Sequence, residues 1–255
     1  MIIPFKNSFD NAEEYDKYAN ITLYISTMLA IIAFAIHSYN EDWKEISNII
    51  NSINCFFILA FAVLEFITKH IFSEASSQKR YDFIDNSFDT SFSEENTKGY
   101  YTNDNIENGI YKMAVNGFEN SLFTYAISKR MLKGLWIKNS LIAIVFIFLA
   151  VLGLNNAFIV ILQLALPLIL LNQAIRHTVF VSRINKIYEN YRRLFQDLLK
   201  NTTKEYKKPE IIINVIEYEA TLSWGGIILD TKIYNELNPE LSKSWEEIKL
   251  KYKIE

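Results

Sequence analysis

The chain is poor in the residues that define several protein classes. Its 255 residues include one cysteine, three histidines, four prolines and seven glycines. The single cysteine, Cys55, cannot form a disulfide within the chain, and so little glycine and proline excludes a collagen-like repeat or a low-complexity disordered protein. The sequence also lacks the phosphate-binding glycine loops, the HExxH and CxxC metal motifs and the nucleophile elbow. We therefore expect no enzyme, cofactor or metal site.

Charge is scarce as well, because Lys, Arg, Asp and Glu make up only 22% of the chain while half of it is hydrophobic. The hydrophobic residues gather in four stretches, at 21–38, 50–71, 137–154 and 157–175. The first stretch has no charged residue and would form a helix about 27 Å long, close to the ~30 Å hydrocarbon core of a bilayer. The alternative is a soluble protein with buried core helices, but four runs of about 18 residues exceed the usual core pattern.

The sequence thus predicts an all-α membrane protein with four transmembrane helices in two hairpins and helical cytoplasmic extensions. Basic residues are nearly absent from the two outer turns, where only Lys44 occurs, so both termini and the middle loop should face the cytoplasm. We expect a multi-pass protein of the bacterial inner membrane. Its predicted parts are an N-terminal segment (1–20), a first hairpin (21–71), a middle segment (72–135), a second hairpin (136–175) and a C-terminal region (176–255).

Helical spacing of apolar residues continues beyond the membrane stretches. It predicts that 74–91 extends the second span, that 106–132 leads into the third and that 178–199 continues the fourth. Two short helices should follow, at 210–236 and 240–252, with Pro239 at the start of the second. Asp82, Asp85 and Asp89 share one face of the first extension, where a solvated face is the preferred interpretation over a cation site.

Basic and aromatic side chains outside the bilayer are the candidates for ligand binding, because such groups bind phosphates and stack on bases. Anchoring to the inner leaflet and structural salt bridges are the alternatives. The candidates are Lys79, Arg80, Tyr81, Tyr101, Arg130, Arg183, Arg192 and Arg193. Neutralising Arg80, or Arg192 together with Arg193, should abolish function and leave the protein in the membrane.

Polar residues within the predicted spans are the candidates for a pore or gate. Glu65 is the one acidic residue in these spans, and a carboxylate in hydrocarbon needs a partner or water. Pro167 removes a backbone hydrogen bond and can kink the fourth span. The full set is Asn54, Glu65, Gln163, Pro167 and Asn172. Their polar faces suit either helix association or an aqueous path.

Three segments carry a resemblance to a known family: SSQKRYDFIDNSFDTSF after the second span, KGYYTNDNIENGIYKMAVNGFENSLFTYAISKRML before the third, and RINKIYENYRRLFQDLL after the fourth. Together they resemble the SMODS-associated four-transmembrane effectors of bacterial anti-phage systems. In that family a Tyr-containing turn precedes a helix with a Gln/Glu-Asn pair, which Tyr101 and Glu119-Asn120 match here. Asn116-Gly117-Phe118 replaces the family's Cys-Gln before that pair.

The resemblance implies a pore-forming effector of abortive infection that is gated by a cyclic nucleotide from a partner synthase. Its partners would be the lipid bilayer, a cyclic oligonucleotide and further copies of the chain, since four spans are few for a conduit. No DNA or RNA polymer is expected. The alternatives from other classes are a constitutive small ion channel or transporter, and a membrane scaffold or sensor that recruits a cytoplasmic partner.

Overall fold

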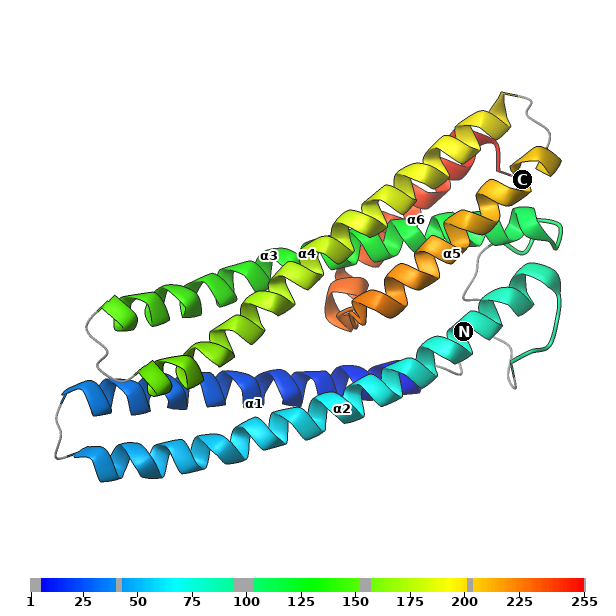
Figure 1. Ribbon diagram of the computed structural model, residues 1–255. Coiled ribbons are helices and arrows are strands. Elements are labelled where there is room, and N and C mark those ends of the chain that lie inside the picture. Colours follow the sequence, from blue (N-terminus) through cyan, green and yellow to red (C-terminus); the bar gives the residue numbers. More distant parts are fainter. Residues whose placement is uncertain (1–5, 40–42, 94–102, 152–156, 201–203, 255) are drawn as a thin grey trace. The chain divides into compact units, whose positions relative to one another are not determined.

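The computed structural model describes residues 6–39, 43–93, 103–151, 157–200 and 204–254, except the side chains of 37–39, 146, 148–151, 157–167 and 204–205. Every regular element in these ranges is helical, which confirms the predicted all-α class. Four helices are long: α1 (Lys6–Tyr39), α2 (Lys44–Phe88), α3 (Ile110–Val151) and α4 (Ala157–Leu199). The 3-10 helix η2 (Lys204–Lys207) and the shorter helices α5 (Lys208–Gly225) and α6 (Thr231–Tyr252) follow (Figure 1).

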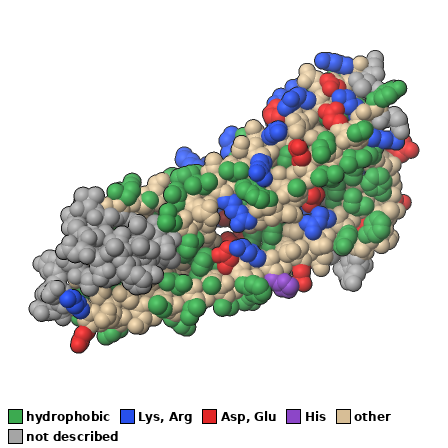
Figure 2. Space-filling model, viewed as in Figure 1, with side chains coloured by type: hydrophobic (Ala, Val, Ile, Leu, Met, Phe, Trp, Pro, Cys, Tyr) green, Lys and Arg blue, Asp and Glu red, His purple; other side chains and the backbone are tan. Residues whose placement is uncertain are grey.

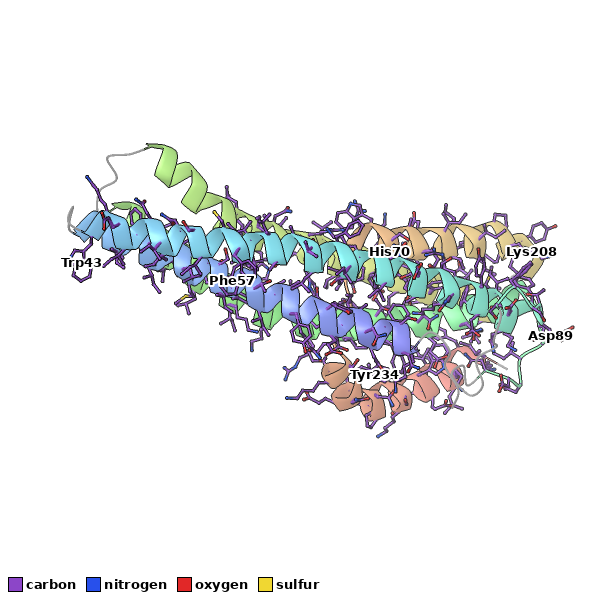
Figure 3. All side chains as sticks on the ribbon, turned by 90° about the horizontal axis from the view of Figure 1, so that it is seen from below. Trp43, Phe57, His70, Asp89, Lys208 and Tyr234 are labelled. Atoms are coloured by element: carbon purple, nitrogen blue, oxygen red, sulfur yellow. The ribbon has the colours of Figure 1, made fainter. Side chains whose placement is uncertain are left out.

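The chain divides into two compact units, and each is described by itself. Unit 1 comprises residues 1–11, 71–131 and 177–255, and unit 2 comprises 12–70 and 132–176. The chain crosses between the units four times, each time inside one of the helices α1 to α4. Helix α2 has 45 residues and is therefore about 68 Å long, twice the ~30 Å thickness of hydrocarbon. Trp43, Phe57, His70 and Asp89 mark its course in Figure 3.

Two helices among the described residues are long and apolar enough to cross a bilayer: α1 over Lys6–Ile36 and α2 over Lys44–Phe88. About half of the side chains in the predicted third and fourth spans, on α3 and α4, lie outside the described residues. Four spans and the cytoplasmic position of the termini therefore stay predictions.

Unit 1 is organised around the ring of Phe118 on α3. Its centroid lies 5.2 Å from that of Phe195 on α4 and 5.5 Å from that of Trp245 on α6. The neighbouring Gly117 has Tyr191 of α4 directly against it, so a larger residue there would overlap the tyrosine hydroxyl. Aromatic rings that bury this much area dominate the energetics of a core. Gly117 and Phe118 of α3 thus build the junction of α3, α4 and α6.

Asp85 organises the turn in which α2 ends. Its carboxylate accepts hydrogen bonds from the backbone nitrogens of Phe92 and Ser93, at 2.8 and 2.7 Å, and from the hydroxyls of Thr90 and Ser93. Burial alone would raise the pKa of Asp85, but these hydrogen bonds outweigh it and lower the pKa. Asp85 therefore has a structural role, and the described residues contain no group of three His, Cys, Asp or Glu arranged to hold a metal ion.

The boundary between the last two helices differs from the prediction. Helix α5 ends at Gly225, Gly226 adopts a left-handed φ of 54°, and α6 begins at Thr231. Pro239 lies inside α6 and does not start a helix. The true start is capped by Asp230, whose carboxylate accepts a hydrogen bond from the nitrogen of Ile233 at 2.8 Å. A glycine C-cap and an aspartate N-cap together outweighed the proline signal.

Candidate functional site

The outer surface of unit 2 is apolar. Large hydrophobic side chains are exposed on all four of its helices, for example Ile21, Phe56, Leu141 and Leu168. Among the described side chains of 21–36, 46–64, 137–147 and 168–175, only Lys138 carries a charge. Figure 2 shows the charged side chains concentrated elsewhere on the visible surface. A soluble monomer rarely exposes so large an apolar surface, so lipid or protein should cover it.

The interior of unit 2 holds the polar contacts. The Ser26 hydroxyl on α1 donates to the Asn54 side-chain oxygen on α2 at 2.6 Å, and both residues are buried. Asn139 on α3 donates through Nδ2 to the backbone oxygen of Leu170 on α4 at 2.7 Å. Leu23, Ala30 and Leu170 form a small buried apolar cluster in the same unit. Hydrogen bonds inside and apolar side chains outside are the arrangement of helices that associate in a bilayer.

The three predicted pore residues whose side chains the structure describes do not form one site. Asn54 is buried against Ser26, and Glu65 is partly buried and paired with Lys69 on its own helix. Asn172 is exposed. The side chains of Gln163 and Pro167 lie outside the described residues. In the structure Asn54 therefore joins two helices, and the Glu65–Lys69 pair suits a carboxylate near the end of a span.

The predicted ligand residues Lys79 and Arg80 face a carboxylate that sequence reasoning missed. Arg80 Nη1 on α2 lies 3.9 Å from Glu219 Oε2 on α5. Burial raises the pKa of Glu219, and the nearby charges of Lys79 and Arg80 oppose that rise only in part. Tyr81, the next residue, is exposed. Two cations and one carboxylate thus meet where α2 and α5 pack within unit 1.

Three of the remaining candidates have other partners. The Arg183 guanidinium lies over the ring of Trp224 on α5, 4.2 Å from its centroid. Arg192 binds both carboxylate oxygens of Glu189, one turn away on α4. Arg193 donates to the side-chain oxygen of Asn190 at 3.1 Å. Of the other two candidates, Arg130 is exposed and Tyr101 lies outside the described residues.

A buried polar cluster lies beside the Glu-Asn pair of α3. The Asn103 side-chain nitrogen donates to Asn116 Oδ1 at 2.9 Å and to Glu119 Oε2 at 2.8 Å. Asn116 in turn donates to Asn86 on α2 at 2.8 Å. Burial raises the pKa of Glu119 to about 7; the Asn103 hydrogen bond and the charge of Lys249 oppose this, and Glu246 adds to it. Glu119 is thus a partly protonated carboxyl at neutral pH that ties α3 to the turn before it.

Comparison with known proteins identifies no relative of this chain. No protein-family model, curated protein or solved structure matches the chain. The function must therefore be argued from the residues themselves.

The described residues form two parts with different chemistry. One is an apolar-surfaced helical unit with a polar interior, and the other is a helical unit with a weakly paired cationic site. Glu219 lies more than a hundred residues beyond its partner Arg80 in the sequence. Trp224 lies on α5, whereas its partner Arg183 lies on α4. A single sequence carries no signal for such pairings, apart from the acidic and aromatic character of 217–224.

Proposed function

We propose that the chain is a membrane effector of bacterial anti-phage defence, in which a cyclic nucleotide binds unit 1 and unit 2 opens a pore in the inner membrane. The observation that carries the membrane part of the proposal is the surface of unit 2, with isoleucine, leucine and phenylalanine outside and the Ser26–Asn54 and Asn139–Leu170 hydrogen bonds inside. The defence role rests on the family resemblance of the sequence.

Continuity of the helices supports a gated mechanism. Each of α1 to α4 contributes residues to both units, so a shift or rotation of one of these helices in unit 1 would be passed to unit 2 through the helix that the two units share. A ligand can act in this way only if it binds one arrangement of the helices more tightly than the other.

The pair of Lys79 and Arg80 is the favoured phosphate contact. Arg80 Nη1 lies 3.9 Å from Glu219 Oε2, and the Arg80 side chain is 40% exposed, so this long ion pair is a weak contact for the guanidinium. A phosphodiester can compete with Glu219 for Arg80, and Tyr81 offers an exposed ring beside the two cations. Displacement would separate α2 from α5, which is the change that the nucleotide would bring about.

The proposal is tested with the purified full-length chain in liposomes that enclose a self-quenched dye. We expect a cyclic oligonucleotide from a broad panel to release the dye, and Lys79→Ala with Arg80→Ala to abolish that release. Lys243→Ala is the matched control because it removes an exposed cation from α6 of the same unit, and it should release dye like the parent chain.

Each other outcome favours a different function. Dye release without nucleotide indicates a constitutive channel. An intact membrane with every nucleotide of the panel contradicts the effector proposal, and retention of a cytoplasmic protein on the same liposomes would then indicate a scaffold.

A further inference from the structure

Helices α5 and α6 are joined by a short apolar turn. We call it the α5–α6 turn; it comprises residues 226–230, between the end of α5 and the start of α6. Three consecutive residues in it, Ile227, Ile228 and Leu229, are large and apolar, and each is partly exposed. Surface turns of soluble proteins are normally built from Gly, Pro, Asn, Asp and Ser. The composition of this turn therefore suits a less polar neighbour than water.

Contacts within unit 1 place the α5–α6 turn beside one particular part of α4. Lys207, directly before α5, forms an ion pair with Asp197 of α4 at 2.9 Å. At the other end of α5, Gly225 lies against the ring of Phe180 on α4. Helix α5 therefore runs antiparallel to α4 (Figure 1), and the turn that follows it lies next to Phe180.

Phe180 follows closely after the predicted fourth span. That span ends at residue 175, five residues earlier in the same unbroken helix, and this difference is about 7.5 Å along the helix axis. The polar layer on each side of the hydrocarbon core is roughly 5–8 Å deep. With unit 2 in the bilayer, as proposed above, Phe180 and the turn beside it fall at the depth of the cytoplasmic headgroups.

The side chains around the α5–α6 turn are of the kinds that membrane interfaces prefer. Trp224 is 41% exposed, and tryptophan is enriched at the level of the headgroups. The Arg183 guanidinium lies over its ring, and Arg183 and Lys232 are exposed cations that attract anionic lipids. Asp230, the only acidic residue of 222–233, is engaged as the N-cap of α6. The charge around the turn is thus complementary to an anionic membrane surface.

The opposite end of α5 provides the contrast. Tyr206 is 83% exposed and precedes Lys207, whose partner Asp197 lies 22 residues beyond the fourth span on α4. That difference is about 33 Å along the helix axis, far beyond the headgroup layer. Both ends of α5 therefore expose large side chains, but only the turn end lies within reach of lipid.

We infer that the α5–α6 turn and Trp224 dock into the headgroup layer of the inner leaflet. This inference rests on the proposed membrane function. Lipid is the favoured occupant because of the position of the turn along α4 and the cations that flank it. Docking fixes this end of α5 at the membrane surface. Glu219, six residues before the end of α5, then holds Arg80 of α2 near a helix that is itself held by lipid.

Site-specific fluorescence quenching tests the docking. The full-length Cys55→Ser chain receives single cysteines, which are labelled with the fluorophore NBD and reconstituted into liposomes of phosphatidylcholine and phosphatidylglycerol. Ile227→Cys and Ile228→Cys place the label in the turn, and Tyr206→Cys is the matched control at the other end of α5. A nitroxide on the lipid headgroups should quench the two turn labels several-fold more than the control label. Iodide in the water should quench them several-fold less.

Leu59→Cys on α2 separates this inference from the membrane function, because Leu59 is 66% exposed on unit 2. A nitroxide on the acyl chains should quench its label. If it does, and the turn labels behave like the Tyr206→Cys label, docking is overturned and the membrane function stands. Turn labels shielded from both nitroxide and iodide would indicate that protein covers the turn and would also overturn docking. A Leu59→Cys label that lipid does not quench would overturn the membrane function and docking together.

Discussion

Replacing Glu119 with glutamine tests the buried polar cluster of unit 1. The folded chain holds the pKa of this carboxyl at about 7, raised from its ordinary value of 4.5 chiefly by burial. The folded state therefore binds the proton more tightly than the unfolded state, and stability falls as the pH rises from about 4.5 to about 7 and then levels off. Linkage between those two pKa values gives a loss of roughly 2 kcal/mol between pH 5 and pH 8.

Glutamine keeps an oxygen that can accept the hydrogen bond from Asn103 and has no proton to lose. Glu119→Gln should therefore remove that part of the pH dependence, so that the variant is more stable than the parent at pH 8 by about 2 kcal/mol and similar to it at pH 5. The assay is urea unfolding of the detergent-solubilised full chain at both pH values. Tryptophan fluorescence reports on the region, because Trp245 is 1% exposed and packs against Phe118.

Glu236→Gln serves as the control, since this exposed glutamate of α6 changes the net charge by the same amount. Its pH dependence should follow the parent chain. Equal slopes for the parent and Glu119→Gln between pH 5 and pH 8 would refute the argument that Glu119 is held protonated by burial.

Three further changes test packing and capping. Gly117→Ala places a methyl group against the Tyr191 hydroxyl and should lower the free energy of unfolding by about 1–3 kcal/mol. Adding Tyr191→Phe should restore most of that loss in the same urea assay, because this buried hydroxyl has no hydrogen-bond partner in the described structure. Asp230→Ala removes the N-cap of α6 and should cost about 1 kcal/mol in urea, whereas Asp230→Asn should cost little. Asn54→Ala breaks the bond to Ser26 and should cost about 0.6 kcal/mol in a detergent-unfolding titration; adding Ser26→Ala should then cost nothing more.

The long helices could be predicted because an apolar stretch is followed, without a break, by apolar residues at helical spacing. In α2 the apolar stretch at 50–71 passes without a glycine or proline into the helical spacing of Tyr81, Ile84 and Phe88. The same continuity, between the fourth apolar stretch at 157–175 and its extension at 178–199, predicts α4 up to Leu199. The end of α5 was placed wrongly because Pro239 is a strong local signal. Its exposed position in α6 lets the helix continue around it, while the glycines at 225 and 226 set the real boundary.

The candidate site could be predicted only in part, since charges can be read from a sequence but their partners cannot. Arg80 was a candidate because arginines bind phosphates, yet its position opposite Glu219 depends on how α5 packs. Arg183 had the same limitation, because stacking on Trp224 needs a tertiary contact. The resemblance pointed to Glu119, and its partner Asn103 becomes visible only when the turn before α3 folds back onto that helix.

The chain passes between the two units four times, each time within a helix. These crossings limit where a residue can be inserted or deleted without disrupting the fold. One extra residue in a helix turns everything beyond it by about 100° and moves it by about 1.5 Å. An insertion at residues 70–71 of α2 would put that helix out of phase with α1, α3 and α4, whose crossings keep their original register. Single-residue insertions should thus be far more damaging at the crossings than in the turn between α5 and α6, even though no side chain is altered in either place.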